Sequence, residues 1–232
     1  SGAAVSPART VVVAGHGADQ VRAAAQAFDE DAQVVVQEEQ LGTAHAVGQA
    51  REALEGFDGT AIILYGDTPF VQPETLEAMC DALRDNDVVV LGFEAADPAR
   101  YGRLVMQGDS LDRIVEFKDA TDQERAITLC NSGVVACKSD LLFDLIDAVG
   151  NDNASKEYYL TDVIGIARTR GLKATTVTCT EAETMGVNSR ADLAVADAAF
   201  QARTRAAMLE QGVTLMAPET VYFARDTYIG GD

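Results

Sequence analysis

Ala61-Ile62-Ile63-Leu64-Tyr65-Gly66-Asp67 is a short apolar run that ends in a glycine and a carboxylate. Its length and its branched residues predict a strand that is buried on both faces. Glycine lets a ligand approach the backbone closely, and open α/β sheets bind ligands beside the carboxyl ends of their strands. Asp67 is therefore a candidate Mg²⁺ ligand, because this hard cation prefers oxygen ligands. The alternative is that Asp67 caps the turn before Pro69, a residue that cannot continue a central strand.

Strand and helix patterns alternate on both sides of this stretch. Apolar runs predict four strands, separated by three segments that predict helices, at 10–14, 19–28, 33–36, 44–54, 61–64, 73–83 and 87–93. Thr43 is placed to cap the helix at 44–54, and Gly42 frees the backbone just before it. The alternation predicts an α/β fold with a doubly wound, mostly parallel, Rossmann-like sheet.

The pattern changes after residue 100. Two apolar segments, 101–106 and 111–116, flank the turn residues Gln107-Gly108-Asp109-Ser110 and predict a β-hairpin insertion. A strand follows at 130–136, but Asn131-Ser132-Gly133 interrupts it early. A polar interruption that contains glycine indicates either close approach of a ligand or a simple bulge.

The last hundred residues are expected to be mainly helical. Helices are predicted at 139–148 and 157–168, followed by a strand at 174–179. The longest helical pattern runs from Ser189 to Gln211 and is closed by Gly212. Such a helix would extend roughly 35 Å, which is long enough to carry the chain away from the sheet as a connector.

Composition limits the classes of function. With 232 residues the chain suits one large domain, or one domain with an appendage. Its net charge of −19 disfavours nucleic acid and anionic membranes as partners, and no apolar run approaches the ~20 residues of a membrane helix. Four cysteines without C-x-x-C spacing and only two histidines argue for free thiols in a reducing cytoplasm and against an ordinary zinc site.

Seven short motifs occur in a fixed order. They are Gln37-x-x-Gln40-Leu41-Gly42-Thr43-x-His45-Ala46, Leu64-Tyr65-Gly66-Asp67-x-Pro69, Tyr101-Gly102-Arg103, Ile114-Val115-Glu116-x-Lys118-Asp119-Ala120-Thr121, Asn131-Ser132-Gly133, Glu157-Tyr158-Tyr159-Leu160-Thr161-Asp162 and Gly186-Val187-Asn188. Each motif is weak alone, but the ordered set is specific. From Thr10 to Gly212 the chain resembles the uridyltransferase half of the bifunctional bacterial enzymes that make UDP-N-acetylglucosamine. In that family a uridyltransferase is fused to a glucosamine-1-phosphate acetyltransferase.

The resemblance implies a nucleotide site built from five matching residues. Gln37, Gly42 and Thr43 would contact the uracil base, and Tyr65 and Gly66 would line the nucleotide pocket. The chemistry is coherent, since a side-chain amide and backbone groups can read the edge of a neutral base.

The resemblance also implies metal and sugar sites. Asp67, as the catalytic residue, and Asn188 would ligate Mg²⁺. Gly102, Glu116 and Asn131 would bind the sugar, with Glu116 accepting hydrogen bonds from hydroxyl groups. Asn131 would address the N-acetyl group or a neighbouring hydroxyl.

Two family features are absent from the printed sequence. The family holds the triphosphate with a Gly-x-Gly-Thr-Arg loop and a following Pro-Lys, and neither occurs here. The hexapeptide repeats of a left-handed β-helix are also absent, apart from a possible first turn near 228–231. We therefore expect a fragment with three parts: a uridyltransferase domain at 1–188 without its first strand, glycine-rich loop and first helix, a connector helix at 189–212, and the start of a truncated acetyltransferase β-helix at 213–232.

The implied reaction is Mg²⁺-dependent uridylyl transfer from UTP to N-acetylglucosamine 1-phosphate, giving UDP-N-acetylglucosamine and pyrophosphate. It would supply precursors for the bacterial cell wall and lipopolysaccharide. A full-length protein would also acetylate glucosamine 1-phosphate with acetyl-CoA and form a homotrimer through its β-helix, while the printed chain, which lacks the triphosphate loop, would be poorly active. The alternatives are another sugar-1-phosphate nucleotidyltransferase and a non-catalytic fragment that binds nucleotide sugars.

Overall fold

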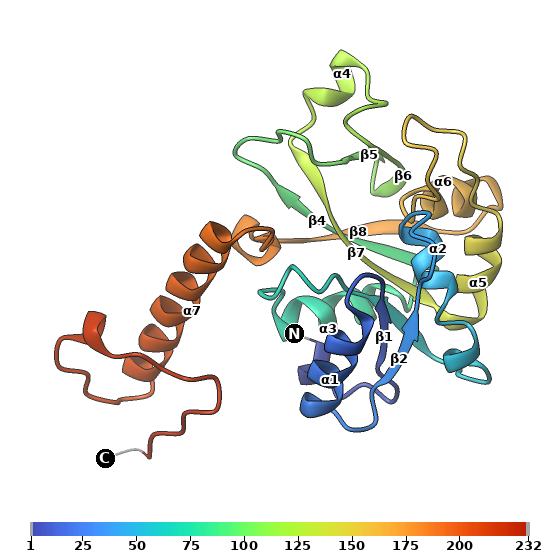
Figure 1. Ribbon diagram of the computed structural model, residues 1–232. Helices are drawn as coiled ribbons and strands as arrows, with labels where there is room; N and C mark the ends of the chain where they lie inside the picture. Colours follow the sequence, from blue (N-terminus) through green and yellow to red (C-terminus); the bar gives the residue numbers. More distant parts are fainter. Residues whose placement is uncertain (1, 231–232) are drawn as a thin grey trace. The chain divides into compact units, whose positions relative to one another are not determined.

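The strand predicted from the opening stretch forms as β3 (Thr60–Ile63), within a six-stranded sheet. In the computed structural model, residues 2–230 are described, and the chain divides into two compact units, 1–184 and 185–232 (Figure 1). The sheet lies in the first unit and has the order β6-β5-β7-β4-β8, with β3 paired to β7 as well. The other strands of this sheet are β4 (Val88–Glu94), β5 (Arg103–Gln107), β6 (Ser110–Val115), β7 (Leu129–Lys138) and β8 (Ala174–Cys179).

The direction of the longest strand, β7, makes most strand pairings in this sheet antiparallel. Its first half lies between β5 and β4, its second half lies between β3 and β4, and all three pairings are antiparallel. Within the sheet only β4 and β8 pair in parallel. The prediction of a mostly parallel sheet is therefore wrong, and the sheet is mixed. The chain returns to the centre of the sheet from the β5–β6 hairpin rather than through a helical crossover, so β7 runs in the opposite direction.

Two further strands, β1 (Val11–Ala14) and β2 (Gln33–Val36), form a separate parallel pair. Helix α1 (Ala18–Phe28) connects them, as the alternating pattern predicted. The predicted β-hairpin also forms, since β5 and β6 pair in antiparallel fashion around Gly108, whose φ of +61° suits a tight turn; the register shifts once, between Val105 and Met106. Short helix α4 (Asp122–Arg125) follows the hairpin.

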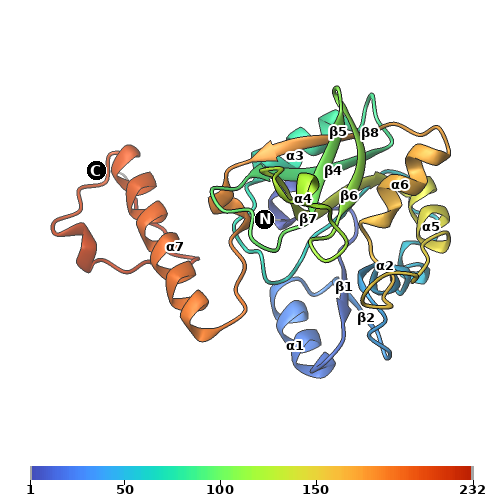
Figure 2. The same cartoon turned by 90° about the horizontal axis from the view of Figure 1, so that it is seen from above.

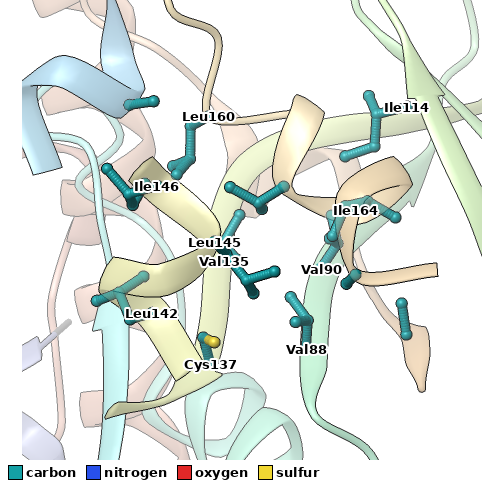
Figure 3. Packing of buried hydrophobic residues seen from close by; sticks show 14 of the residues in the cluster. Val88, Val90, Ile114, Val135, Cys137, Leu142, Leu145, Ile146, Leu160 and Ile164 are labelled. Atoms are coloured by element: carbon teal, nitrogen blue, oxygen red, sulfur yellow. The ribbon is translucent and has the colours of Figure 1, made fainter. Parts of the chain in front are cut away.

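The core follows the two-residue period of the strands. Val88 and Val90 of β4 pack on one face of the sheet with Val135 of β7, whereas Val89 and Leu91 pack on the other face. Figure 3 shows the first of these faces, where Leu142, Leu145, Ile146 and Ile164 approach the strands. Residues 61–64 of the opening stretch alternate between the same two faces, although each is only partly buried. The prediction of a strand buried on both faces therefore holds in part, because side chains pack on both faces but none of residues 61–64 is fully buried.

Helices cover both faces of the sheet (Figure 2). Helix α3 (Pro73–Ala82) packs on one face, while α5 (Ser139–Asp147) and α6 (Asp162–Thr169) pack on the other. Two predicted helices are shorter than expected. Helix α2 (Thr43–Gly48) ends before the predicted Leu54 and is followed by a 3-10 turn, and α6 begins at Asp162 rather than at residue 157.

The second unit is built on α7 (Arg190–Glu210), whose bounds match the predicted long helix. The hydroxyl of Ser189 caps it by accepting a hydrogen bond from Asp192 N–H at 3.1 Å. Gln201 holds the following segment through two hydrogen bonds with the backbone of Phe223. Within residues 213–230 no strand is present, so the structure shows no start of a β-helix. Among the described residues, no helix is both long and apolar enough to cross a membrane.

Candidate active site

The first part of the candidate site lies after β2. The backbone N–H of Gln37 donates to the carbonyl of Ala14 at the end of β1, which fixes the point where the chain leaves the sheet. The side chain of Gln37 is buried, and its Nε2 donates to the carbonyl of Gly42 at 3.1 Å. The same Nε2 lies 2.9 Å from Nδ1 of His45. The loop between β2 and α2 is thus closed by a side chain that sequence analysis assigned to base recognition.

Gly42 and Thr43 are held against a second segment, residues 157–161. Tyr158 N–H donates to the carbonyl of Leu41 at 2.8 Å, and the carbonyl of Tyr158 accepts from Ala44 N–H at 2.9 Å. These backbone bonds explain why residues 157–161 are not helical. A Cβ on Gly42 would lie 2.5 Å from the carbonyl oxygen of Tyr158, and φ of Gly42 is +119°, so the position requires glycine.

Thr43 has a different role from the predicted helix cap. Its Oγ1 accepts a hydrogen bond from Leu160 N–H at 2.8 Å, and the N-cap of α2 is Gly42, without a side-chain cap. The prediction that Thr43 caps the helix is therefore wrong. The hydroxyl instead fastens the 157–161 segment, because it gives the Leu160 N–H, which precedes α6, a hydrogen-bond acceptor.

Tyr65 connects this region to the strand β7. Register places Ile63 opposite Val135, so Tyr65 continues toward Gly133, where a Cβ would lie 2.8 Å from the tyrosine ring. Gly133 has φ of +92° and sits in the bulge that interrupts the register of β7 with β4. The predicted interruption of this strand is therefore a bulge that leaves room for the Tyr65 ring.

The electrostatic environment of Tyr65 links it to three other candidates. Burial raises the pKa of its hydroxyl, hydrogen bonding with Thr43 lowers it, and the carboxylates of Glu116 and Asp67 raise it further. The net pKa is above the ordinary value of 10.0, so the hydroxyl is a neutral hydrogen-bonding group at physiological pH.

Glu116, Gly102 and Asn131 form the next part of the site. A Cβ on Gly102 would lie 3.4 Å from one carboxylate oxygen of Glu116 and 3.5 Å from the other. Asn131 N–H donates to the carbonyl of Gly102 at 2.8 Å, and the Oδ1 of Asn131 accepts from Gly133 N–H at 3.0 Å. Three residues assigned to the sugar thus lie beside one another, and the bulge orients the Asn131 side chain so that its Nδ2 remains for a ligand.

Glu116 is half-buried, and its environment disfavours charge. Burial raises the pKa of its carboxyl, the Thr161 hydroxyl lowers it by donating to Oε1 at 3.3 Å, and the nearby carboxylates of Asp119 and Asp162 raise it. The net pKa is above the ordinary 4.5. A partly desolvated carboxylate of this kind gains from additional hydrogen-bond donors, such as the hydroxyl groups of a sugar.

The predicted metal ligands belong to different units of the chain, Asp67 to the first and Asn188 to the second. Asp67 is exposed after β3, next to exposed Gly66, and Asn188 is exposed in the second unit. Asn188 N–H donates to the carboxylate of Asp192 at 3.1 Å, which orders the entry to α7. Among the described residues no group of three or more histidine, cysteine or carboxylate side chains is arranged to hold a metal. The metal roles of Asp67 and Asn188 stay predictions.

Arg103 belongs to the Tyr101-Gly102-Arg103 motif, which predicts no role for its side chain. Its guanidinium is only 2% exposed and donates to carbonyls within residues 98–101 and to that of Arg125 at 3.3 Å. It lies 5.9 Å from the centre of the Phe117 ring, and no salt bridge involves it within residues 2–230. Arg103 therefore joins the loop before Gly102 to the loop after Glu116.

Glu183 is a second residue that sequence analysis missed. One carboxylate oxygen accepts from Gln72 N–H at 3.1 Å and from the Thr75 hydroxyl at 2.6 Å, and the other accepts from the N–H and hydroxyl of Thr180. Burial raises the pKa of Glu183, but the four hydrogen bonds outweigh it and the net pKa is below 4.5. This carboxylate fastens the start of α3, after the Asp67 loop, to the segment after β8.

We expect Glu183→Gln to lower the free energy of unfolding by about 1–3 kcal/mol at pH 7. An amide has one acceptor oxygen, so one of two backbone donors would face an NH₂ group. Because the folded pKa is depressed, the wild-type stabilisation is complete above the unfolded pKa near 4.5 and is lost as pH falls through the folded value. Urea unfolding at pH 7 and below pH 4 measures this difference. Exposed Glu77→Gln on α3 is the control, and an equal loss at both pH values would contradict the prediction.

Two hollows of the described surface lie elsewhere. A cavity of about 420 Å³ is lined by residues such as Arg51, Phe57 and Phe143, and one of about 300 Å³ is lined by Asp58, Gly59 and others. Both lie toward the amino end of β3, whereas the candidate residues follow its carboxyl end. The connected set of polar side chains, and not cavity size, identifies the candidate site.

Comparison with known proteins identifies the family of this chain. The model of the MobA-like NTP transferase domain matches residues 2–136. The chain is 70% identical over 230 residues to a protein of Ruegeria pomeroyi named bifunctional protein GlmU, covering 99% of this chain and 51% of that protein. A protein of the same name from Paracoccus denitrificans is 54% identical over 232 residues, 100% of this chain and 52% of that protein. The chain thus spans about half the length of the curated relatives it matches, and the resemblance predicted from the ordered motifs is confirmed.

A solved structure shows the same fold at much lower identity. The nucleoside-diphosphate-sugar pyrophosphorylase from Vibrio cholerae superposes with a TM-score of 0.64 at 11% identity, over 83% of this chain and 81% of that one. The shared fold is a mixed α/β sheet with helices on both faces, as in other NTP transferase domains.

Proposed function

The chain belongs to the family of MobA-like NTP transferase domains, and from this premise we propose that it contains the nucleotide and sugar sites of an N-acetylglucosamine-1-phosphate uridyltransferase. One observation carries the proposal. Seven candidates from distant parts of the sequence form one connected set, namely Gln37, Gly42, Thr43, Tyr65, Gly102, Glu116 and Asn131. Such convergence of polar groups at strand ends is typical of ligand sites in α/β folds.

In this proposal the nucleotide occupies the side of the set formed by the loop before α2. Gln37 and the backbone at Gly42 and Thr43 read the uracil, and Tyr65 and Gly66 border the ribose and phosphates. No Cβ is present at Gly66, and nothing would lie within 4 Å of one, so the backbone there is open to a ligand. The fixed backbone of Gly42 supports this assignment, because a rigid loop positions hydrogen-bonding groups before the ligand arrives.

The sugar occupies the opposite side of the set, beside Gly102. Glu116 accepts hydrogen bonds from ring hydroxyls, and Asn131 donates its Nδ2 to the carbonyl of the N-acetyl group. The second role is supported by the Oδ1 of Asn131, which is already occupied by Gly133 N–H. A positioned amide donor distinguishes an acetylated sugar from a free amine, because the unacetylated sugar leaves that donor unpaired.

We propose that a divalent cation, Mg²⁺, binds the oxygen donors of Asp67 and Asn188. Asp67 is exposed, no hydrogen bond holds its carboxylate among the described residues, and its charge raises the pKa of Tyr65. Carboxylate and amide oxygens suit a hard cation that also binds phosphates. When bound, the cation would offset the repulsion between the two anionic substrates.

The reaction we propose is an in-line displacement. The phosphate oxygen of N-acetylglucosamine 1-phosphate attacks the α-phosphorus of UTP, and pyrophosphate leaves. The residues of this chain orient the base and the sugar, which is the main requirement in phosphoryl chemistry of this kind. No nucleophilic side chain is needed. A second candidate function is transfer to another sugar 1-phosphate, which the sugar test below distinguishes.

The activities of the whole protein are also proposals. The relatives are named bifunctional, and we propose that the full-length protein acetylates glucosamine 1-phosphate with acetyl-CoA and forms a homotrimer through its remaining half. The product would enter cell-wall and lipopolysaccharide synthesis in the cytoplasm. The four cysteines, all free, are consistent with a reducing compartment.

A sugar-discrimination experiment tests the proposed function. We expect the full-length protein to release pyrophosphate from UTP with N-acetylglucosamine 1-phosphate and far less with glucosamine 1-phosphate. Asn131→Asp should raise the KM for the acetylated sugar roughly tenfold or more, because the Asp retains an acceptor for Gly133 N–H but loses the Nδ2 donor. The KM for UTP should change little. Asn86→Asp is the control, because it removes an Nδ2 that donates to the carbonyl of Ala82 in α3, away from the candidate site. Equal use of both sugars by the wild type would contradict the function.

A further inference from the structure

The orientation of the Gln37 side-chain amide is fixed by the structure. The nitrogen and oxygen of a side-chain amide are distinguished by their hydrogen-bond partners. The carbonyl oxygen of Gly42 lies 3.1 Å from one end of this amide, and a carbonyl can only accept a hydrogen bond. That end of Gln37 is therefore Nε2. The assignment does not depend on the protonation of any other group.

The same argument fixes the state of His45. Its Nδ1 lies 2.9 Å from Gln37 Nε2, and its Nε2 lies 3.3 Å from Gln49 Nε2, which already donates to the carbonyl of His45. A neutral imidazole has one acceptor nitrogen, and the shorter contact assigns that role to Nδ1 and the proton to Nε2. His45 is part of α2, and Gln49 one turn later donates to the carbonyl of His45 at 3.1 Å. The ring is thus held on a short helix whose start is fixed by Gly42.

The remaining atom of the amide is free. Both hydrogens of Gln37 Nε2 are used by Gly42 and His45, and within the described residues nothing donates to Oε1. Gln37 is 9% exposed, yet its Oε1 is not among the buried polar atoms that lack a partner, so solvent reaches this oxygen. Gln37 therefore offers a ligand one acceptor and no donor.

We propose that His45 is a positioning residue that sets the base preference of the site by holding Gln37 with its carbonyl oxygen outward. This inference rests on the proposed function and adds the reason for its choice of base. Uracil has an N–H donor at N3, which matches a single acceptor. Cytosine has an unprotonated N3 there, so the two lone pairs would face each other, and a buried mismatch of this kind discriminates strongly.

The test compares two substitutions of His45 in the full-length protein. His45→Asn retains an acceptor close to the position of Nδ1, whereas His45→Leu has a similar volume without an acceptor. We expect the Leu variant to reduce the ratio of kcat/KM for UTP over CTP by about tenfold, because the amide of Gln37 loses one of its two restraints. The Asn variant should keep the wild-type ratio. An unchanged ratio in a folded Leu variant would overturn the proposal.

An NMR measurement on the wild type gives a second test, which does not depend on whether the variants fold. The ¹⁵N shifts of the His45 ring in the wild type should show Nδ1 unprotonated at neutral pH, and a proton on Nδ1 would overturn the proposal. The outcomes also separate the two ideas. A wild-type protein that uses neither UTP nor CTP contradicts the proposed function, whereas UTP turnover with a base preference independent of position 45 contradicts only the role of His45.

Discussion

Replacing Gly42 with alanine is expected to destabilise the first unit by more than about 4 kcal/mol and to abolish uridylyl transfer. The new Cβ would lie 2.5, 2.7 and 3.0 Å from the backbone O, N and C of Tyr158. Moving these atoms would break hydrogen bonds, because the N–H and carbonyl of Tyr158 are hydrogen-bonded to the backbone of Leu41 and Ala44. The φ of +119° adds backbone strain. Urea unfolding and a pyrophosphate-release assay measure the two effects.

Gly56→Ala is the matched control for this change. Gly56 also has a positive φ, +68°, but nothing would lie within 4 Å of a Cβ there. Its substitution should therefore cost only about 1 kcal/mol, the ordinary penalty for a left-handed backbone. If Gly42→Ala were no more destabilising than Gly56→Ala, the close contact between the loop before α2 and Tyr158 would be absent in solution.

The contact at Gly42 also shows where sequence patterns stop being informative. The spacing of apolar residues after residue 157 suits a helix, but the backbone of Tyr158 bonds to residues more than one hundred positions earlier. Tertiary hydrogen bonds therefore override local preference in this segment. The signal for the contact is the Gly-Thr pair itself, since a glycine before a helix often marks a close approach of two backbones.

The sequence predicts which residues face each side of the sheet, but it does not predict whether neighbouring strands run parallel or antiparallel. Alternation along β3 and β4 is a local property with a period of two, and both strands bury alternate residues on opposite faces as expected. Direction depends instead on the connection that precedes a strand. Nothing within 130–136 distinguishes a parallel strand from an antiparallel one, and β7 became antiparallel because it follows the hairpin excursion.

The residues of the candidate site could be predicted from the sequence, but the contacts between them could not. The motifs nominated Tyr65 and Asn131, yet the bulge that joins them depends on the register that pairs Ile63 with Val135. Arg103 and Glu183 were missed because a buried arginine and a four-bonded carboxylate look like ordinary surface charges in a sequence. Their partners are mostly backbone groups, which carry no side-chain signal.

Removing the carboxylate of Asp67 should lower kcat of the full-length protein about a thousandfold or more while leaving its stability unchanged. Asp67 is exposed and has no hydrogen bond among the described residues, so the fold loses no contact in Asp67→Ala. The proposed metal, in contrast, loses its only charged protein ligand. Asp58→Ala is the matched control, because Asp58 is an equally exposed carboxylate just before the same strand, β3. Thermal unfolding without metal should be the same for both variants and the wild type.

A double substitution tests whether Asp67 and Asn188 act on one ion. Two residues that hold the same cation are not independent, so the variant that combines Asp67→Ala with Asn188→Ala should be no worse than Asp67→Ala alone. Independent roles would instead multiply the two losses. Titration with Mg²⁺ gives a second readout, since each single variant should need a higher metal concentration for half-maximal rate. Turnover of Asp67→Ala within about tenfold of the wild type at the same Mg²⁺ concentration would remove this aspartate from the metal site and leave the base and sugar sites without the charge compensation that their anionic ligands require.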